Sequence, residues 1–427
     1  MTERYTTTEM IDVEDAREAI LSQVTVVPAE KVTITACVGR VLAENIVSDI
    51  DIASFDSTAM DGFAVHFSDF QDVTEDNPLK LEIVGILGAG SVYQGAIASG
   101  QALRIMTGAP VPNSTDTIVK IEDVIVEGES AEHPSGTYAV FTKMPKFNDH
   151  IRPRGEEAMK GDVLLHRGER ISTAGTGLLA ATGNADIAVY RRPRVAITST
   201  GDELVDVDQI PGPGQIRNSN SYSLAAAAID AGAEVTVLPA ISDDRDALVE
   251  VLGYAANSFD FVITSGGAAE GDFDYVTSVV RELGTLFFNT VNMRPGKAQT
   301  FGIIAGTPVF GLPGNPAAAM VGFEILIRPA LLKMQGLPNL RRPVMRATLT
   351  SEVRKKADAR RFYLRARVDR DNEQRLIVTP EKNQSSALFN ALNRGNCLLV
   401  IPEGLEPCPP GTEVDCIRLD IQEGVVL

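Results

Sequence analysis

The stretch that decides the fold is PVFGLPGNPAAAMVGFEILIRPALLK, at residues 308–333. It begins with a short apolar run, Val309 to Leu312, which is typical of a buried strand. A Pro-Gly-Asn-Pro turn at 313–316 ends this run, and an apolar helix follows at once, with Asn315 suited to the N-cap and Pro316 to the first helical position. Because a helix N-terminus presents unpaired N–H groups, the turn is either a plain strand-to-helix connection or an anion site.

Upstream of this stretch, strand and helix patterns alternate from about residue 193. We expect strands at 194–200, 234–241 and 261–265, helices at 222–231, 246–256 and 275–283, and an extended segment at 285–293. Alternation of this kind predicts a mostly parallel sheet with helices on both faces.

Ligands of such sheets bind beyond the carboxyl ends of the strands, where this chain has polar, glycine-rich segments. Their glycines allow a ligand to approach the backbone, while Arg294 and Lys297 supply positive charge for an anion. Glu203 and Asp274 could hold a hard cation such as Mg²⁺, or could cap helices. Asp243 and Asp244 also precede a predicted helix, and for them capping is the favoured role. The candidate substrate-binding residues here are Ser199, Thr200, Gly201, Ser265, Gly266, Gly267, Arg294, Pro313, Gly314, Asn315 and Pro316.

The composition limits the classes of function that this protein can have. The chain has 427 residues, enough for three or four domains, and a net charge of −18, which argues against binding nucleic acid or an anionic membrane. An anionic ligand would therefore need a locally basic pocket.

The four cysteines form no CxxC and the four histidines no HxxxH, so a zinc site is not expected. With no signal peptide or apolar membrane span, we expect a cytoplasmic protein with reduced cysteines.

The rest of the chain is mainly β. Short apolar runs separated by turn residues indicate a β-rich domain from about 52 to 147 and a small β-barrel or sandwich after about 340. Within the first of these, DSTAMDGF at 56–63 and RIMTGAPVP at 104–112 combine small polar residues with an acid and glycines. The segment IRPRGEE at 151–157 is either a solvated loop or an oxyanion site built on its two arginines.

These motifs, together with STGDEL at 199–204, SGG at 265–267, PGK at 295–297 and LPGNP at 312–316, occur in the order found in the MoeA family. The sequence resembles these molybdopterin molybdenumtransferases, relatives of the gephyrin E domain, over essentially its whole length. The resemblance implies a homodimer whose subunits combine α/β and β domains, with an α/β domain similar to MogA and MoaB. The implied domains are an elongated, discontinuous domain (1–51 and 148–180), a β-rich domain (52–147), the α/β active-site domain (181–335) and a C-terminal β-barrel (336–427).

The reaction implied by the resemblance inserts molybdate into adenylylated molybdopterin, with Mg²⁺-dependent release of AMP. Catalytic positions then fall on Asp61, Glu203, Asp274 and Lys297, with Glu203 and Asp274 also handling the metal. Asp61 and Thr107 match positions that face the partner subunit's cleft, and Arg152 matches an arginine near the oxyanion. Further binding positions are Arg360, which with Arg365 flanks Tyr363 in an R-x-x-F/Y-x-R pattern, and Ser386. Possible partners are a MogA-like adenylyltransferase and molybdoenzymes or their chaperones.

The sequence departs from the family in three places, one of which is Arg294 at a position that is commonly lysine. The usual SGGVSVGDYDY is SGGAAEGDFDY at 265–275, and Ala298 replaces the last proline of PGKP. These changes leave open a non-catalytic protein that holds finished cofactor as a scaffold. A third reading, adenylyl transfer to molybdopterin, rests only on the MogA-like domain.

Overall fold

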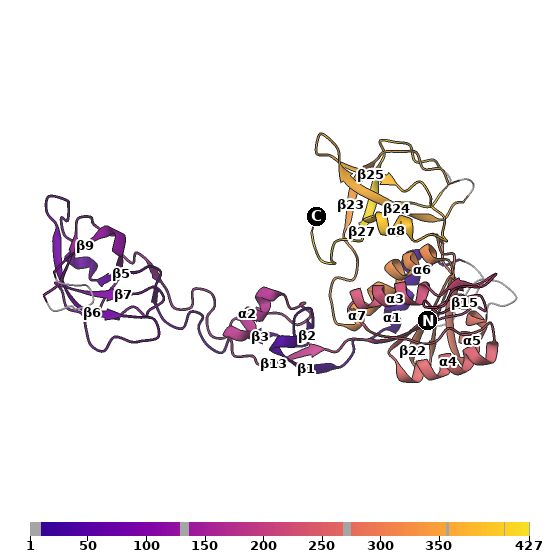
Figure 1. Ribbon diagram of the computed structural model, residues 1–427, viewed down its shortest axis with the longest axis horizontal. Coiled ribbons are helices and arrows are strands. Elements are labelled where there is room, and N and C mark those ends of the chain that lie inside the picture. The colour runs from indigo at the N-terminus through magenta and orange to yellow at the C-terminus, as the bar shows by residue number, and fades with distance from the viewer. Residues whose placement is uncertain (1–9, 129–135, 268–274, 356–357, 405, 427) are drawn as a thin grey trace. The chain divides into compact units, whose positions relative to one another are not determined.

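The computed structural model describes residues 10–128, 136–267, 275–355, 358–404 and 406–426. The chain divides into two compact units (Figure 1). The first contains residues 1–44, 168–172 and 186–427, and the second contains residues 45–167 and 173–185. None of the described helices is long and apolar enough to cross a membrane.

A six-stranded sheet forms the centre of the first unit, in the order β17-β14-β18-β22-β21-β19. Its strands are β14 (Arg194–Ser199), β17 (Glu234–Val237), β18 (Phe261–Ser265), β19 (Gly284–Thr290), β21 (Ala298–Ile304) and β22 (Thr307–Leu312). β17, β14, β18 and β22 pair in parallel, whereas β21 runs antiparallel to both of its neighbours. Five strands therefore point the same way, as expected from the sequence, and the reversed strand β21 is an addition that the sequence pattern did not reveal.

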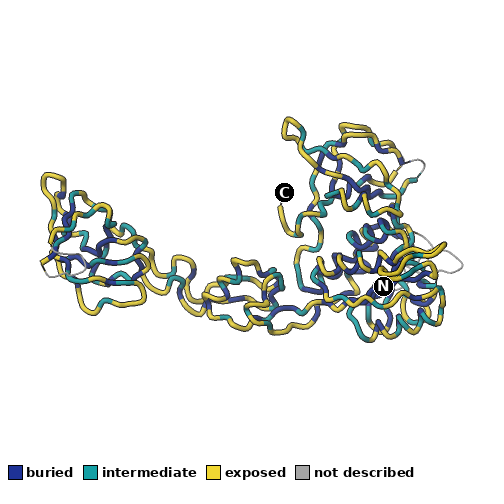
Figure 2. Tube along the Cα trace, in the orientation of Figure 1, coloured by how far each residue is buried: buried dark blue, intermediate teal, exposed yellow. Residues whose placement is uncertain are grey.

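Helices cover both faces of this sheet. They are α1 (Val13–Gln23), α3 (Asn220–Asp230), α4 (Arg245–Ser258), α5 (Val276–Leu283), α6 (Pro316–Gly322) and α7 (Arg328–Met334), with a π-helical turn at Phe323–Ile327 between the last two. α3 contacts α6, and α1 contacts α7, while α4 and α5 pack together against the other face. With both faces covered, every residue of β18 is buried. Figure 2 shows dark blue, buried backbone inside this domain and yellow, exposed backbone at its surface.

The predicted helix starts agree with the structure where capping signals are strong. α6 begins at Pro316 with Asn315 at the N-cap position, and α4 begins after Asp244, whose carboxylate accepts from the Ala247 N–H at 2.8 Å. Asn315 differs because its side chain makes no capping bond. The side-chain amide of Asn315 therefore does not cap the helix, although its position in the sequence predicted that it would.

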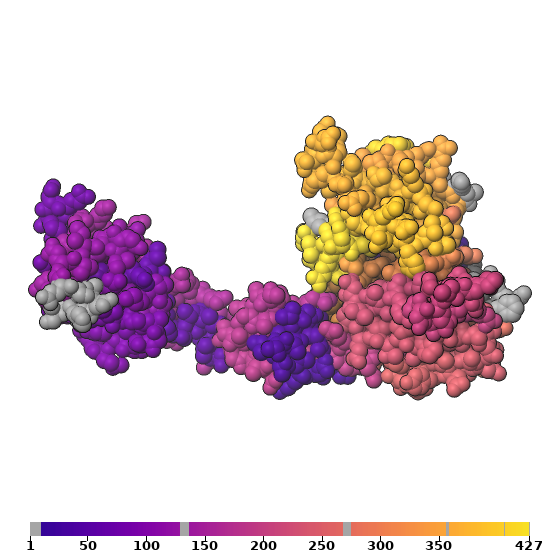
Figure 3. All heavy atoms as spheres, viewed as in Figure 1, coloured from indigo at the N-terminus to yellow at the C-terminus, as the bar shows by residue number. Residues whose placement is uncertain are grey.

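The C-terminal part of the first unit is a closed five-stranded barrel. Strand order is β24-β25-β23-β27-β26, and β24 also pairs with β26. The members are β23 (Val344–Leu349), β24 (Arg361–Arg370), β25 (Leu376–Pro380), β26 (Cys397–Ile401) and β27 (Glu413–Arg418), with the short helix α8 (Asn390–Arg394). The short strand β20 (Met293–Arg294) leaves the α/β domain and pairs in parallel with β24, which ties the barrel to the α/β domain. Figure 3 shows the orange and yellow atoms of the barrel against those of the α/β domain.

Smaller elements complete the first unit. β1 (Ala29–Thr33), β2 (Val41–Leu42) and β13 (Asp186–Tyr190) form a three-stranded sheet in the order β1-β13-β2. β15 (Leu204–Val205) pairs with β16 (Ile216–Arg217). A 3₁₀ turn lies at Ile34–Ala36.

The second unit contains a β-rich domain, as expected. Its six-stranded sheet has the order β8-β5-β7-β6-β10-β9. The strands are β5 (Gly62–Val65), β6 (Leu79–Leu87), β7 (Gln101–Ile105), β8 (Thr117–Lys120), β9 (Val124–Glu127) and β10 (Tyr138–Phe141), with 3₁₀ turns at Phe67–Asp69 and Ile121–Asp123. The remainder of this unit consists of two two-stranded ladders and helix α2 (Thr173–Ala181). One ladder pairs β11 (Ile151–Arg152) with β4 (Ser57–Thr58), and the other pairs β12 (Val163–Leu165) with β3 (Ile46–Val47).

Candidate active site

The turn at 313–316 separates two pockets in the first unit, and Pro313 and Asn315 line both. The smaller pocket, which we call the sheet-edge pocket, has a volume of about 360 Å³ and lies beyond the carboxyl ends of β14, β18 and β22. The larger, the basic pocket, has a volume of about 970 Å³ and lies between the 294–298 loop, this turn and the barrel. A ligand that spans both would pass directly over the turn.

The sheet-edge pocket gathers most of the polar residues predicted from the strand ends. It is lined by Ser199, Thr200, Gly201, Glu203, Asn218, Asn220, Asp243, Ser265, Gly266, Gly267, Pro313, Gly314, Asn315 and Pro316, among others. Sequence reasoning did not select Asn218, Asn220 or Asp243. The first two belong to the segment that leads into α3, and their side-chain hydrogen bonds organise the pocket floor.

Asn220 is the central polar residue of this floor. Its Nδ2 donates to Ser265 Oγ and to the Gly314 carbonyl, both at 2.8 Å, so it connects α3 to the ends of β18 and β22. Asn220 Oδ1 and Thr200 Oγ1 are buried and lack a hydrogen-bond partner among the described residues. Leaving a buried polar atom unpaired costs roughly 1–3 kcal/mol, so the two oxygens favour a site that binds a polar ligand.

The glycines of this pocket are required by close packing. Gly266 and Gly267 have φ values of +95° and +60°. A Cβ on Gly266 would lie 2.5 Å from the Thr200 carbonyl oxygen, and one on Gly267 would lie 2.8 Å from Thr200 Oγ1. Larger residues would therefore displace the backbone that forms the pocket wall.

Of the two predicted metal ligands, only Glu203 can be placed, because Asp274 lies outside the described residues, as do Ala268, Ala269 and Glu270. Glu203 lines the sheet-edge pocket, and a Cβ on Gly201 would lie 2.3 Å from its Oε2. Among the described residues, no group of three or more His, Cys, Asp or Glu could hold a metal ion. Mg²⁺ often takes only one or two protein carboxylates together with water and substrate phosphates, and two carboxylate residues, Glu203 and Asp243, line this pocket.

The turn itself presents fewer helix donors than its sequence suggested. The Ala317 N–H donates to the Ser386 carbonyl at 2.8 Å, and the Ala319 N–H donates to the Asn315 carbonyl at 3.0 Å. The second of these is the first regular bond of α6, so the donor that the barrel takes from a ligand is the Ala317 N–H. The same Ala317–Ser386 bond holds the 384–386 segment of the barrel against the turn, which brings Ser386 into the basic pocket.

Positive charge is concentrated in the basic pocket, in contrast to the strongly acidic chain. Two of its lining residues are acidic, Glu352 and Glu381. Seven are basic: Arg294, Lys297, Arg354, Lys355, Arg360, Arg365 and Lys382. The positive potential of this pocket can therefore attract an anionic ligand, although the net negative charge of the protein repels one.

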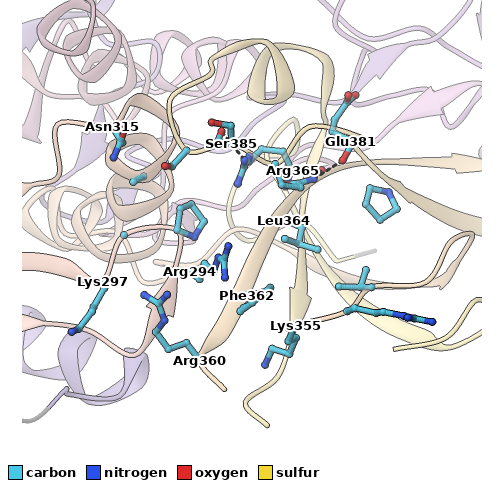
Figure 4. A pocket seen from close by; sticks show the side chains of 18 of the residues that line it. Arg294, Lys297, Asn315, Lys355, Arg360, Phe362, Leu364, Arg365, Glu381 and Ser385 are labelled. Atoms are coloured by element: carbon cyan, nitrogen blue, oxygen red, sulfur yellow. Dashed lines mark hydrogen bonds between the residues drawn. The ribbon is translucent and has the colours of Figure 1, made fainter. Parts of the chain in front are cut away.

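Arg365 is the most deeply buried cation of the basic pocket, with 1% of its surface exposed. Its Nη2 donates to the Ser385 carbonyl at 3.1 Å (Figure 4), whereas its Nε is buried without a partner among the described residues. Burial lowers the pKa of this guanidinium to about 10, so it remains charged at neutral pH. A buried cation with an unpaired N–H and no neutralising carboxylate is suited to an anion.

Sequence reasoning named Arg365 only as a neighbour of Tyr363 and selected Arg360. The signal for Arg365 was its place in the mainly apolar run from Phe362 to Ala366, all of which is buried in β24. This run indicates a strand covered on both faces, but it does not identify which face adjoins a pocket.

Arg360 and Arg294 line the pocket but share one counter-ion. Asp358 Oδ2 accepts from Arg294 Nη1 at 2.7 Å and from Arg360 Nη2 at 2.7 Å, and Oδ1 accepts from Arg360 Nε at 2.9 Å. The hydrogen bonds from Arg360 and then from Arg294 hold the pKa of Asp358 far below its usual range, against the opposing effect of burial. Asp358 was not predicted as part of the site.

Two further residues complete the cationic wall. Lys355, which is 2% exposed, donates to the Pro402 carbonyl and lies 4.9 Å from the centroid of the Phe362 ring. Arg294 lies over the same ring at 5.0 Å (Figure 4). Lys297, on the loop between β20 and β21, is exposed and lines the pocket.

Three predicted residues belong to the second unit. Asp61 and Thr107 come together, since one Asp61 carboxylate oxygen accepts from the Thr107 N–H at 2.7 Å and from its Oγ1 at 2.6 Å. These two bonds lower the pKa of Asp61, the side-chain bond more strongly. Arg152 is exposed on β11, where it pairs in the ladder with Ser57 of β4.

Comparison with known proteins accounts for nearly the whole chain. Residues 11–183 match the MoeA N-terminal region (domain I and II), residues 196–333 a probable molybdopterin binding domain, and residues 346–419 the MoeA C-terminal region (domain IV). The molybdopterin molybdenumtransferases of Staphylococcus aureus (strain COL) and Staphylococcus epidermidis (strain ATCC 12228 / FDA PCI 1200) are 34% and 33% identical over 408 residues, 95% of each chain. Two structures of a molybdopterin biosynthesis MoeA protein from Pyrococcus horikoshii give TM-scores of 0.82 and 0.81 at 30% and 26% identity, and cover 97% and 96% of this chain and 100% of their own.

Proposed function

This chain belongs to the MoeA family, and we propose from that premise how its two pockets divide the work of a molybdenumtransferase. The protein is an enzyme of molybdenum cofactor biosynthesis that inserts molybdenum into molybdopterin. The finer assignment is that adenylylated molybdopterin occupies the sheet-edge pocket while molybdate occupies the basic pocket. Pro313 and Asn315, which line both, would then stand between the two reactants.

The observation that carries this assignment is the buried guanidinium of Arg365. Molybdate is a compact tetrahedral dianion, and Arg365 offers an unpaired Nε in a wall that also includes Lys297 and Ser386. Charge-assisted hydrogen bonds to a buried guanidinium are among the stronger polar contacts available to a protein. We therefore place molybdate at Arg365. A role for Arg152 in placing molybdate stays a prediction, since that residue belongs to the second unit.

The sheet-edge pocket suits the pterin part of the substrate. Asn220 Oδ1 and Thr200 Oγ1 can accept from ring N–H groups, and Gly266 and Gly267 let a flat ligand approach the backbone. The phosphate groups would extend toward Arg294 and Lys297, which line the other side of the turn. This orientation would bring the dithiolene sulfurs of the pterin close to the oxyanion. Because the proposed reaction needs no covalent nucleophile, positioning the two reactants in this way would be the main contribution of the site.

Magnesium would be held by Glu203, together with substrate phosphates and with Asp274 as the predicted second ligand. When bound, such an ion neutralises charge on the phosphates and so assists release of AMP. The protein's own contribution is to fix the phosphates between Lys297 and the turn, and to keep molybdate beside the pterin while AMP leaves.

We further propose a homodimer in which the partner subunit's Asp61 faces this cleft. The support is the Asp61–Thr107 pair, whose two hydrogen bonds keep the carboxylate ionised and fixed in direction although it is exposed. A cytoplasmic location and contacts with a MogA-like adenylyltransferase, with molybdoenzymes or with their chaperones stay predictions from the sequence.

The test mixes the purified protein with adenylylated molybdopterin, Mg²⁺ and molybdate, and follows AMP release and active cofactor. We expect both products from the wild-type protein, loss of both in Glu203→Ala, and a raised molybdate requirement in Arg365→Gln. The assignment of pockets would be wrong if Arg365→Gln kept the wild-type molybdate requirement. The activity itself would be wrong if the wild-type protein released no more AMP than Glu203→Ala.

A further inference from the structure

Asp358 connects two arginines of the basic pocket that come from different parts of the first unit. Arg294 follows β19 in the α/β domain, and Arg360 immediately precedes β24 in the barrel. Both donate to the Asp358 carboxylate at 2.7 Å through Nη atoms, and the Arg360 N–H also donates to Asp358 Oδ1 at 3.2 Å. The Asp358 side chain is only 15% exposed, so water screens these bonds weakly.

These contacts occupy part of each guanidinium group and offset its charge. Arg360 uses Nε and Nη2 on Asp358, while its Nη1 donates to the Met293 carbonyl at 3.2 Å. Arg294 combines its bond to Asp358 with a position over the Phe362 ring. Arg365 and Lys297, by contrast, form no ion pair with any of the residues that the structure describes.

The charge that a ligand meets is consequently smaller than the residue composition of the wall suggests. Asp358 offsets part of the charge of Arg294 and Arg360, and Glu352 pairs with Arg354 at 2.7 Å. Binding energy from a charged wall grows with the charge of the ligand, so every uncompensated cation favours highly charged anions over less charged ones. A carboxylate behind the wall lowers the positive charge that the ligand meets, and so reduces the preference for highly charged anions.

We propose that Asp358 is a specificity-determining residue of the basic pocket: by neutralising Arg294 and Arg360 it makes the pocket prefer a compact dianion to more highly charged phosphate anions. This inference rests on the proposed use of the pocket for an oxyanion. It gives Asp358, which does not line the pocket, an indirect role. Pyrophosphate, which is more highly charged than molybdate, is the natural probe for the competing class.

The experiment measures the dissociation constants of molybdate and of inorganic pyrophosphate by calorimetry on the full chain without Mg²⁺. In Asp358→Asn, the ratio of the two constants should shift about tenfold toward pyrophosphate, since one more unit of wall charge changes affinity by roughly an order of magnitude for each extra ligand charge. Asp358→Glu keeps the charge and should keep the wild-type ratio. Arg294→Gln removes a cation and should shift the ratio in the opposite direction, which tests the proposal even if Asp358→Asn fails to fold.

Asp371→Asn is the matched control. Asp371 lies in the same barrel and its carboxylate accepts from the backbone N–H and Nε of Arg375 at 2.9 and 2.8 Å, but it does not line the pocket. It should leave the ratio unchanged. An unchanged ratio in Asp358→Asn, or a parallel loss of affinity for both anions, would overturn the proposal and leave Asp358 a structural residue. Failure of the wild-type protein to bind molybdate at all would instead overturn the proposed function of the pocket.

Discussion

Asn220 Nδ2 lies 2.8 Å from the carbonyl oxygen of Gly314, a residue 94 positions away, and this bond holds the 313–316 turn against helix α3. The same Nδ2 atom also donates to Ser265 Oγ, so one amide fixes the ends of two neighbouring strands. The geometry of the sheet-edge pocket therefore depends on a residue outside the glycine-rich loops that form most of its wall.

Replacing this amide should damage both stability and substrate binding. Asn220→Ala removes two hydrogen bonds in a buried position, and we expect a loss of roughly 1–3 kcal/mol in unfolding free energy. The Michaelis constant for the pterin substrate should rise more than that for molybdate, because the basic pocket keeps its cations. Asn257→Ala is the control: its Nδ2 also donates to a carbonyl, that of Gly253, but on the exposed face of α4. Equal effects on both substrates would contradict the division into two pockets.

Removing the buried cation should weaken oxyanion binding without unfolding the barrel. In Arg365→Gln we expect molybdate affinity to fall about 10- to 100-fold, the range for hydrogen bonds to a charged group. Stability should stay the same or rise, because a buried charge without a carboxylate partner is costly to the fold. Thermal unfolding and calorimetric titration separate these effects. Arg375→Gln, an exposed arginine of the same barrel, should change neither, and a parallel loss of stability and affinity would show that Arg365 is only structural.

The same residue predicts an alkaline limit for binding. Burial lowers the pKa of Arg365 to about 10, so its charge is complete at neutral pH and is lost as the pH rises through that value. The advantage of wild type over Arg365→Gln in molybdate affinity should therefore be constant up to about pH 9 and then shrink. Comparing two proteins cancels the titration of the pocket lysines, which both retain. A constant advantage up to pH 10.5 would contradict the assignment of the oxyanion to Arg365.

The contribution of Arg365 to the free energy of unfolding changes in the same alkaline range. The unfolded chain binds the proton of Arg365 more tightly than the folded chain does, so this group's contribution to stability rises between about pH 10 and the ordinary arginine pKa. A loss of binding that follows the titration of Arg365 is therefore not caused by a loss of this group's own contribution to stability.

The sequence predicted the elements whose signals are local. The turn at 313–316 and the start of α6 at Pro316 follow from neighbouring residues, as does the N-cap at Asp244. Strand β21 escaped prediction because an apolar run such as Ala298–Ile304 does not state its direction in a sheet. Its reversal nevertheless leaves β19 parallel to β22, so the expected position of the 294–297 loop at the carboxyl edge is correct.

Long-range partners account for what the sequence could not supply. Asp358 meets Arg294 across 64 positions, and neither residue carries a local sign of the other. The donor at Ala317 looked free for a ligand because nothing near it in sequence reveals the Ser386 carbonyl. In the sequence Arg365 is one of several arginines, and only the folded barrel shows that it is almost completely buried.

The pair of Asp61 and Thr107 provides a test in the second unit. Thr107→Val removes the hydroxyl donor and keeps the N–H, so the pKa of Asp61 should rise toward its ordinary value. Because the folded-state pKa of this carboxylate is lowered, its charge is present above its ordinary pKa and is lost only as the pH falls through the lowered one. Carbon-detected NMR of the Asp61 carboxyl would show the shift, and the acid limb of AMP release should move to higher pH. Thr74→Val, which affects another exposed threonine of the same unit, should leave the titration unchanged.

The last prediction concerns the C-terminal segment. Arg328 on α7 donates through Nε to Glu423 at 2.5 Å and through Nη1 to Asp230 at 2.7 Å, and the side chains of Arg328 and Glu423 are both 4% exposed. Glu423→Gln leaves the buried guanidinium without its main partner, and removal of one member of such a pair typically costs about 3–5 kcal/mol. We expect faster hydrogen exchange at 328–334 in Glu423→Gln.

The pH dependence of this contact has a definite sign. Burial alone would raise the pKa of Glu423, but the hydrogen bond and charge of Arg328 outweigh it, and the pKa is lowered overall. The stabilisation is therefore complete above the ordinary glutamate pKa and disappears as the pH falls through the lowered value, so exchange in the wild-type protein should accelerate only in that acid range. Glu413→Gln, at an exposed position on β27, is the control and should exchange like the wild type. Slow exchange at 328–334 in Glu423→Gln would mean that packing of α7, rather than this ion pair, holds the helix in place.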